Sequence, residues 1–238
     1  MSDGSLGYGN VNEENNLIYN FNTAPDDIKY KWNYLFGNLP KNIREQILMD
    51  KVSTFSITNY KTADKMSDIL LSLKGINNNS TILDGTACVG GNTISFAKKG
   101  FKVISVELDK QRSELLLHNI KLYNLDNKVK VYNKNLLDIY KRFKVDVLFI
   151  DPPWGGIEYI NEEFIDLYLG NIEISELCFK IKNYTKYIAI KTPINFNYKK
   201  FKSNMIEFNN HTKKFKFIIK KPIILKKMLL IIIYIQRL

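Results

Sequence analysis

Short apolar runs alternate with segments of helical periodicity through the last two thirds of the chain. The apolar runs predict strands at residues 81–84, 102–108, 129–132, 145–150, 187–192, 215–219 and 228–235. Helices are expected at residues 93–99, 110–123 and 174–181. The two closing strands leave no room for a helix between them. This order indicates an α/β fold with a doubly wound, seven-stranded sheet whose last strand is antiparallel.

The beginning of the chain lacks this alternation. Residues 1–27 are rich in Gly, Asn, Ser and acidic residues and show no helical or strand period, so we expect a disordered N-terminal tail. Residues 28–75 predict a small helical N-terminal extension. Residues 76–238 then form the main domain.

Within the extension, residues 41–51 predict a short helix, and residues 52–58 an irregular or extended stretch. Apolar residues next recur at helical spacing as far as Leu73. We expect Thr58 or Asn59 to cap this helix and Gly75 to end it.

The formal net charge of +11 is concentrated toward the C-terminus. Lys180 to Lys227 contains fourteen lysines and one acid, Glu207, whereas residues 1–179 carry twenty basic and twenty-three acidic side chains. This distribution predicts a polyanionic partner such as RNA, with the basic C-terminal third contacting its phosphates. The alternative is a solvated lysine face in a chain whose Lys, Asn and Ile content reflects A/T-rich coding.

Two cysteines, Cys88 and Cys178, lie in different contexts without metal-type spacing. They indicate neither a disulfide framework nor a zinc site, and we expect no metal and an intracellular protein, in nucleus or cytoplasm. The N-terminus lacks the pattern of a secretory signal. The most apolar stretch, residues 228–235, is too short to span a membrane, so no membrane partner is predicted.

A glycine-rich turn joins the first strand of the main domain to its first helix. Such a turn lets a ligand lie against backbone amides at the helix N-terminus. The turn is not a G-x-G-x-x-G sequence, so a dinucleotide is not indicated, and Asp84 at the strand end favours a cationic amino-acid moiety, as in S-adenosylmethionine. The alternative is a tight turn without a ligand. The candidate cofactor-binding residues here are Asp84, Gly85, Thr86, Ala87, Gly90 and Asn92.

The next two strands add polar groups at the same edge of the sheet. Glu107 ends the second strand about twenty residues after the turn, where an acid accepts hydrogen bonds from both ribose hydroxyls of a nucleoside. Asn135 follows the third strand, where the adenine amino group would fall. Asp109 is left as a neighbour or helix N-cap. These positions predict S-adenosyl-L-methionine as the cofactor.

The sequence Asp151-Pro152-Pro153-Trp154-Gly155-Gly156 follows the fourth predicted strand. The prolines stiffen the chain and remove two backbone donors, and the glycines let a substrate approach the backbone. Asp151 and the Pro152 carbonyl can receive the protons of an exocyclic amine while Trp154 stacks on its ring. We therefore predict methyl transfer to that nitrogen. The alternative is an ordinary strand-ending turn with Trp154 in the core.

Three further residues are candidates for substrate binding. Trp32 lies in an aromatic segment with interleaved lysines, which either packs as core or helps to hold a nucleotide. Lys191 and Asn195 follow at the carboxyl end of the fifth predicted strand, beside the expected cleft.

Three motifs together resemble the trimethylguanosine synthase family of cap-specific guanine-N2 methyltransferases: Phe55-Ser56-Ile57-Thr58, the stretch from Asp84 to Ala97, and Pro152 to Gly156. The similarity covers roughly residues 29–200. It implies a class I S-adenosylmethionine-dependent methyltransferase fold with a helical extension that completes the active site. It also implies that Trp154 stacks on the 7-methylguanine of a capped RNA, and that Ser56 and Thr58 lie where the extension meets cap and cofactor.

The chain departs from the family pattern at two positions. Asn135 stands where the family usually has Asp, and Ile194 stands where a Pro-Arg-Asn pattern places an arginine that contacts the cap phosphates. Lys191, Lys199 or Lys200 is expected to supply the missing charge.

Two competing functions remain open at this stage. An adenine-N6 methyltransferase of RNA or DNA uses a similar Asp-Pro-Pro-aromatic sequence on a flipped base. Gly155-Gly156 and the Phe-Ser-x-Thr stretch favour the cap substrate instead. The second alternative is a non-catalytic cap- or RNA-binding module, and the pairing of Asp84 with Glu107 speaks against it.

Overall fold

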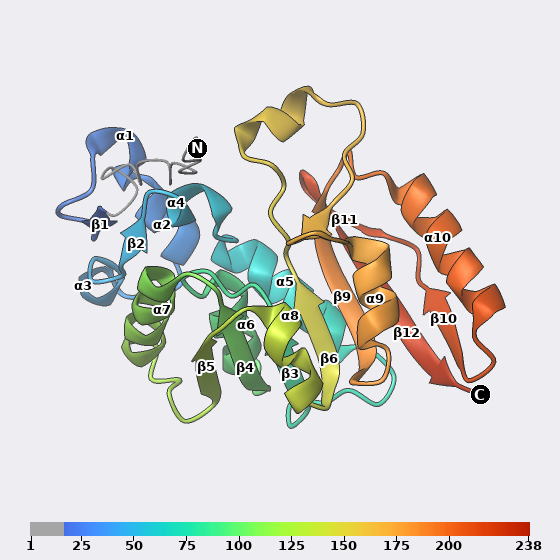
Figure 1. Ribbon diagram of the computed structural model, residues 1–238. Helices are drawn as coiled ribbons and strands as arrows, with labels where there is room; N and C mark the ends of the chain where they lie inside the picture. Colours follow the sequence, from blue (N-terminus) through green and yellow to red (C-terminus); the bar gives the residue numbers. More distant parts are fainter. Residues whose placement is uncertain (1–16) are drawn as a thin grey trace, which may run out of the picture.

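The structure is a computed structural model that describes residues 17–238, built around a central mixed sheet (Figure 1). The strands of this sheet are β3 (Thr81–Asp84), β4 (Lys102–Glu107), β5 (Val129–Asn133), β6 (Val145–Ile150), β9 (Thr185–Pro193), β10 (Phe215–Ile219), β11 (Ile223–Leu225) and β12 (Met228–Arg237). Across the sheet their order is β10-β12-β9-β6-β3-β4-β5, and β11 pairs with β12 outside this path.

Strands β5, β4, β3, β6 and β9 are mutually parallel, and β12 is antiparallel to both of its neighbours, β9 and β10. The predicted doubly wound sheet with an antiparallel last strand is therefore confirmed. Strand β11 is an addition that the sequence analysis missed. It is joined to β12 by Lys226 and Lys227, a pair that lacks the Gly, Asn or Asp typical of hairpin turns.

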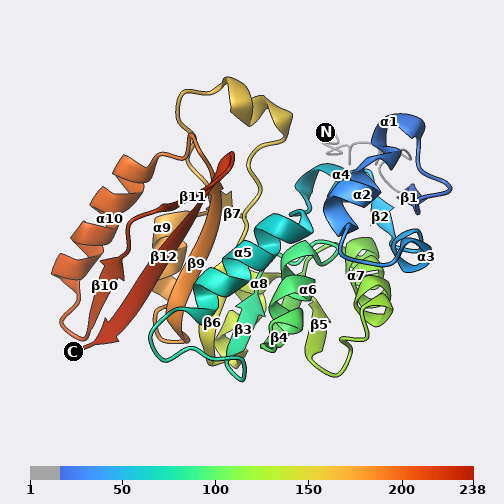
Figure 2. The ribbon, with the colours of Figure 1, turned by 180° about the vertical axis from the view of Figure 1, so that it is seen from behind.

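Helices cover both faces of the sheet (Figure 2). One face is covered by three helices, α5 (Tyr60–Leu71), α6 (Gly91–Lys98) and α7 (Lys110–Leu122). The other face is covered by α8 (Leu136–Ile139), α9 (Ile174–Ile181) and α10 (Tyr198–His211). Because its central strands are buried on both faces, their sequences are continuous apolar runs rather than alternating ones.

The three helices predicted in the main domain are confirmed as α6, α7 and α9. Helix α10 was not predicted. Only Phe201 and Met205 are buried along its length, so its sequence is mostly polar and its apolar period is weak. Asn59 caps α5 by accepting a hydrogen bond from the Thr62 N–H at 3.1 Å, as expected, but α5 ends at Leu71, before Gly75.

The N-terminal extension contains short elements: β1 (Ile18–Tyr19), α1 (Asp26–Lys29), α2 (Lys31–Phe36), α3 (Lys41–Arg44), β2 (Met49–Asp50) and α4 (Ser53–Ser56). Three expectations were wrong in part. β1 pairs with β2 and Ala24 is buried, so residues 17–27 are not a disordered tail, while residues 1–16 lie outside the described part. Only Lys41–Arg44 of the predicted 41–51 helix is helical, and a helical turn, α4, interrupts the stretch at 52–58.

The extension is fixed to the main domain by buried polar contacts. Arg112 on α7 donates from Nε to Asp50 Oδ2 at 2.8 Å. The Asn119 side chain accepts from the Leu48 N–H at 3.0 Å and donates to the Leu48 carbonyl at 2.9 Å and to the Val89 carbonyl at 3.0 Å. The same asparagine therefore joins the extension to the glycine-rich loop.

Helix α5 belongs to the core of the sheet. Met66 and Leu70 pack in the same cluster as Ile82 and Val147, and the Ser67 and Ser95 hydroxyls lie 2.7 Å apart. No break in packing therefore accompanies the predicted domain boundary after residue 75.

No helix in the described part of the chain is long and apolar enough to cross a membrane.

Candidate functional site

The glycine-rich loop between β3 and α6 is held by the strands on both sides of β3. The Gly85 N–H donates to the Phe149 carbonyl on β6 at 2.9 Å, and the Ala87 N–H donates to the Val106 carbonyl on β4 at 3.0 Å. Gly90, with a φ of 107°, adopts a conformation that residues with a Cβ rarely take. The loop therefore has a defined shape at the N-terminus of α6.

Asp84 is fully buried beneath this loop. Its carboxylate accepts hydrogen bonds from the Thr93 hydroxyl at 2.7 Å and from the Thr86 N–H at 3.4 Å. Burial raises the pKa of Asp84 to about 7, and these two hydrogen bonds oppose the rise. Since Asp84 has no exposed surface, it supports the loop from below, and its direct contact with a cofactor amino group stays a prediction.

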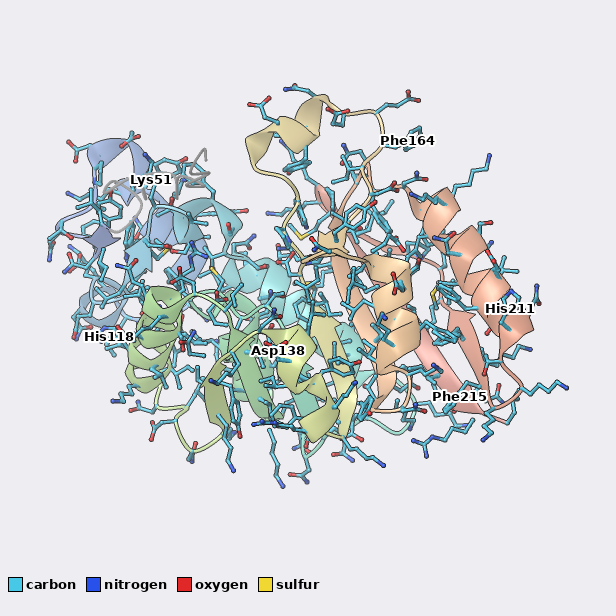
Figure 3. The ribbon with its side chains drawn as sticks, in the orientation of Figure 1. Lys51, His118, Asp138, Phe164, His211 and Phe215 are labelled. Atoms are coloured by element: carbon cyan, nitrogen blue, oxygen red, sulfur yellow. The ribbon has the colours of Figure 1, made fainter. Side chains whose placement is uncertain are left out.

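Asp84→Asn should flatten the dependence of stability on pH. The pKa of Asp84 is raised, so the folded state holds this proton more tightly than the unfolded chain does. Asp84 therefore lowers the free energy of unfolding as pH rises from about 4 to about 7, by on the order of 4 kcal/mol. Urea unfolding across this range measures the slope. The control is Asp138→Asn at an exposed carboxylate labelled in Figure 3, and an unchanged slope in Asp84→Asn would contradict the assignment.

Glu107 ends β4 with its carboxylate aligned by backbone amides. Oε2 accepts from the Cys88 N–H at 2.8 Å, and Oε1 accepts from the Asp109 N–H at 2.9 Å. Burial raises the pKa of Glu107, while the two amides favour its charged form. Each oxygen keeps a second lone pair, so both ribose hydroxyls of a nucleoside fit this carboxylate.

Two buried side-chain atoms near the start of α6 have no hydrogen-bond partner among the described residues: Thr58 Oγ1 and Asn92 Oδ1. The backbone carbonyl of Thr58 lies only 2.6 Å from where a Cβ on Gly91 would stand, so the extension rests directly on the helix N-terminus. Buried polar atoms without a protein partner are rare in folded proteins, so these two atoms are available to a ligand group or to water. The Asn92 amide oxygen accepts hydrogen bonds and the Thr58 hydroxyl can donate or accept one. Both atoms fit the charged amino-acid end of S-adenosylmethionine, with its carboxylate toward the α6 amides.

Asn135 lies after β5 and is the N-cap of α8. Its Oδ1 accepts from the Leu137 N–H at 3.0 Å. An amide oxygen can accept a second hydrogen bond, so the predicted contact with an adenine amino group remains compatible with this geometry. Asp109 is confirmed as the N-cap of α7, since it accepts from the Arg112 N–H at 2.8 Å.

Asp151 and Lys191 form a buried ion pair at the carboxyl ends of β6 and β9. Lys191 Nζ lies 2.5 Å from Asp151 Oδ2, and the two side chains are 4% and 14% exposed. The Asp151 N–H donates to Thr86 Oγ1 at 2.8 Å, which joins the pair to the glycine-rich loop. Burial raises the pKa of Asp151, and Lys191 opposes that rise.

Trp154 is half-buried beside this pair. Its ring centroid lies 5.2 Å from that of Tyr159 in an edge-to-face arrangement and 5.0 Å from Lys191 Nζ. Its indole nitrogen is buried without a hydrogen-bond partner in the described structure, although it lies near enough to Asp151 to favour the charged carboxylate. Beyond it, a Cβ on Gly155 or Gly156 would meet nothing within 4 Å, so the space there is open.

Asn195 positions the segment that follows the tryptophan. Its Nδ2 donates to the Tyr159 carbonyl at 2.7 Å, in the middle of the short helix η3 (Ile157–Asn161), and to the Glu162 carbonyl at 2.8 Å, at the C-cap of that helix. Its Oδ1 is buried without a partner among residues 17–238. Asn195 therefore holds the loop that follows Trp154, and its expected contact with substrate stays a prediction.

Trp32 requires a correction. Its side chain is fully buried, and its indole N–H donates to the Ile47 carbonyl at 3.0 Å inside the core of the extension. It is therefore a core residue, and the expectation that it contacts substrate was wrong. Ser56 is exposed on α4, and its contact with substrate stays a prediction.

The structure shows which lysines near Ile194 are free to replace the positive charge of the family's arginine. Ile194 is exposed just beyond β9. Lys191 is buried in its pair with Asp151, and Lys200 Nζ lies 2.5 Å from Asp166 Oδ2 on the surface. Lys199 is exposed on α10. Two of the three expected lysines are thus already paired with carboxylates.

Two supporting residues were missed. Thr93 bridges Asp84 to the Ser105 hydroxyl, which lies 2.8 Å from its own hydroxyl. A threonine at the first turn of a helix is ordinary in sequence, so no signal distinguished it.

In the described part of the chain, no group of three or more His, Cys, Asp or Glu side chains could hold a metal ion.

Known proteins resemble this chain in sequence. It is 30% identical over 183 residues to a trimethylguanosine synthase of Schizosaccharomyces pombe. The aligned region covers 74% of this chain and 74% of the yeast protein. It is 35% identical over 125 residues to the uncharacterized protein L320 of Acanthamoeba polyphaga mimivirus, but the match spans only 48% of that protein and 50% of this chain.

Solved structures resemble the chain in fold. A putative O-methyltransferase from Klebsiella pneumoniae matches with a TM-score of 0.53 at 11% identity, covering 90% of this chain and 91% of the other. The human methyltransferase 10 domain containing protein matches with a TM-score of 0.51 at 14% identity, covering 75% and 84%. The chain therefore has the class I methyltransferase fold.

A family profile described as RNA cap guanine-N2 methyltransferase matches residues 79–236, which is more than half of the chain. The matched segment contains the glycine-rich loop, Glu107, the Asp151–Lys191 pair and Trp154. This match agrees with the full set of motifs and with the similarity to the fission yeast trimethylguanosine synthase. The chain belongs to the RNA cap guanine-N2 methyltransferase family.

Proposed function

We propose that this protein transfers a methyl group from S-adenosylmethionine to the exocyclic N2 of a 7-methylguanosine cap on RNA. The observation that carries the proposal is the buried Asp151–Lys191 pair beside Trp154. It places a carboxylate, a half-buried aromatic ring and open space at the carboxyl ends of β6 and β9. Ligands of open α/β sheets bind at this edge.

The cofactor would be held by groups from three strand ends. Glu107 receives the ribose hydroxyls, Asn135 the adenine amino group, and Asn92 and Thr58 the amino-acid end. When bound, S-adenosylmethionine supplies a sulfonium-activated methyl group, which needs no metal to be transferred. The protein's own task is to position the amine and to exclude water.

Asp151 and the Pro152 carbonyl orient the guanine amine. Lys191 occupies Asp151 Oδ2, which leaves Oδ1 for the substrate N–H. The methyl group would leave the cofactor's sulfur as it bonds to N2, with S-adenosylhomocysteine as the second product. N2 then loses a proton, which a charged Asp151 can accept and pass on to water. Lys191 favours the charged carboxylate in a buried site, where burial alone would favour the neutral acid.

Trp154 provides the stacking surface for the base. A 7-methylated guanine is positively charged, and a cation over an indole face gains about 1 kcal/mol or more. The charge of Lys191 near the ring is balanced by Asp151, so it does not oppose this contact. The lysines of the last third then supply a positive field for the phosphates of the RNA.

A methyl-transfer assay tests the proposal with three substrates: RNA with a 7-methylguanosine cap, RNA with an unmethylated cap, and an adenine-containing oligonucleotide. The expected result is transfer to the first, with the label on guanine N2. Transfer to adenine would establish the adenine-N6 alternative, and cap binding without transfer would indicate a non-catalytic module.

Glu107→Gln should weaken cofactor binding at least about tenfold. The glutamine keeps the size of the side chain, but the charge-assisted hydrogen bonds to ribose, worth about 1.5 to 3 kcal/mol each, lose their charge. Calorimetry with S-adenosylhomocysteine measures the change. Glu114→Gln is the matched control, because Glu114 is an exposed carboxylate on α7. An unchanged affinity in folded Glu107→Gln would disprove the cofactor assignment.

A further inference from the structure

We infer that the RNA chain next to the target guanine binds a surface formed by Lys31, Tyr34, Phe55 and Lys226, which we call the aromatic–lysine surface. This inference rests on the proposed function, because it names where the substrate's following nucleotides run. Three of the residues come from the N-terminal extension and one from the β11–β12 turn. The surface therefore combines residues that are far apart in the sequence.

The register of the sheet places the β11–β12 turn beside the active site. Met228, the first residue of β12, pairs with Pro193, the last residue of β9, so Lys226 and Lys227 lie just beyond the strand that carries Lys191. Only β9 separates β12 from β6, and two strand spacings amount to about 10 Å. Figure 2 shows this turn at the upper edge of the sheet, on the side of the extension.

The turn reaches the extension through a lysine and an aromatic ring. Lys226 Nζ lies 5.7 Å from the ring centroid of Tyr34. The Tyr34 hydroxyl accepts from Asn59 Nδ2 at 3.0 Å, and Asn59 follows Thr58, which rests on the start of α6. The surface is thus anchored one residue from a predicted cofactor contact.

A second lysine–aromatic pair extends the surface along the extension. Lys31 Nζ lies 3.5 Å from the ring centroid of Phe55. Phe55 on α4 is 63% exposed, and Tyr34 on α2 is 52% exposed. The two other aromatic residues of α2, Trp32 and Phe36, are buried. Exposed rings beside cations are the combination that binds single-stranded nucleic acid, since bases stack on the rings and lysines meet the phosphates.

The backbone at Lys226 supports a role for its side chain. Its φ is 58°, in the left-handed region where Gly or Asn is usual and a lysine is strained. Lys226 is also exposed. A long cation at a position that favours glycine, within 5.7 Å of the centre of an exposed ring, is explained by a phosphate ligand rather than by the needs of the turn.

The strained turn provides a sharp test, because Lys226→Gly removes the cation while relieving the backbone. The probes are a 7-methylguanosine-capped RNA of ten nucleotides and the cap dinucleotide without further chain. Lys226→Gly should raise the KM of the capped decanucleotide about fivefold or more and change that of the dinucleotide less than twofold. Its melting temperature should equal or exceed that of the parent protein.

Two further variants sharpen the result. Tyr34→Ala combined with Phe55→Ala should weaken binding of the decanucleotide about 25-fold or more, since each lost stack alone weakens it about fivefold or more. Lys216→Gln is the control: Lys216 is exposed and pairs with Gln236 at the opposite end of β12, next to Phe215, which Figure 3 labels at the lower edge of the molecule. This control should leave the KM unchanged. Lys226→Gly should also reduce the salt dependence of binding by about 0.7 slope units per lost phosphate contact.

The outcomes separate this inference from the proposed function. If neither substrate is methylated, the proposed function fails, while fluorescence anisotropy with the same decanucleotide still tests the surface. If Lys226→Gly binds the decanucleotide as tightly as the parent, at whatever melting temperature, Lys226 does not contact the RNA and the inference is overturned. An equal loss for both probes would also overturn it, because the surface would then contact the cap itself.

Discussion

Lys191→Met should lower kcat for methyl transfer at neutral pH by about 10²-fold or more, while leaving cofactor affinity nearly unchanged. The substitution removes the cation that lies 2.5 Å from the Asp151 carboxylate in a buried site. Lys191 then no longer opposes the effect of burial, so the pKa of Asp151 rises further and a larger fraction of the residue is protonated. A neutral acid no longer accepts a proton from the substrate amine, and losses of this kind fall in the range of general acid–base effects.

The pH dependence gives the more specific result. If activity requires the charged form of Asp151, the acid limb of the kcat profile follows its pKa and moves to higher pH in Lys191→Met. The stability of Lys191→Met should also depend on pH. Because the pKa of Asp151 is raised in the folded state, its contribution to stability is largest at low pH and falls as pH increases through that pKa. The variant should therefore lose more stability at pH 8 than at pH 5.

The double variant Asp151→Asn with Lys191→Met separates charge from packing. Removing one partner of a buried pair costs about 3 to 5 kcal/mol, whereas neutralising both leaves no unpaired charge. The double variant should therefore recover stability but not activity. Lys191→Met with normal kcat and an unmoved acid limb would show that the pair is only structural.

Trp154→Ala should reduce activity on a 7-methylguanosine cap more than on an unmethylated cap. Removal of the ring takes away about 1 to 3 kcal/mol of base stacking. The cation–π part of that energy exists only for the positively charged 7-methylguanine. Values of kcat/KM for the two caps, measured beside a melting curve, provide the comparison.

The chain contains a matched contrast in its other tryptophan. Trp32 is fully buried, so Trp32→Ala should destabilise the fold by about 3 to 5 kcal/mol and affect the two caps equally. Half-buried Trp154 should lose less stability but more cap discrimination. Should Trp154→Ala resemble Trp32→Ala in both measurements, Trp154 would be a core residue and the cap assignment would lose its main support.

The sheet and its ligand-binding edge could be predicted because their signals are local. Strands buried on both faces require continuous apolar runs, such as Val145–Ile150, and a glycine-rich turn follows the first of them directly. Glu107 and Asp151 each end a strand of the same parallel sheet. Parallel strands bring their carboxyl ends to one edge, so the positions of these residues in sequence were enough to place them together.

The burial of the aromatic residues in α2 depended on the fold. Trp32, Tyr34 and Phe36 stand at alternate positions of a short helix, and the helix period alone does not say which of them meets the domain. Trp32 is core because Ile47, fifteen residues later, folds back to accept its N–H. Tyr34 is left on the surface. The sequence left core packing and nucleotide contact both open for this segment, and the packing showed that Trp32 is core while Tyr34 is exposed.

Long-range pairing decided the chemistry of the site. Lys191 is forty residues from Asp151, and from the sequence it was one of three lysines expected to replace the phosphate-binding arginine that is missing at Ile194. Adjacent parallel strands β6 and β9 instead bring it to the carboxylate in a buried position, where desolvation favours the ion pair over a free charge. The sequence by itself thus determined the fold, the family and the edge at which ligands bind. Which charges are paired at that edge, and which remain free for RNA, was decided by the tertiary structure, since pairing requires side chains from distant segments to share one low-dielectric space.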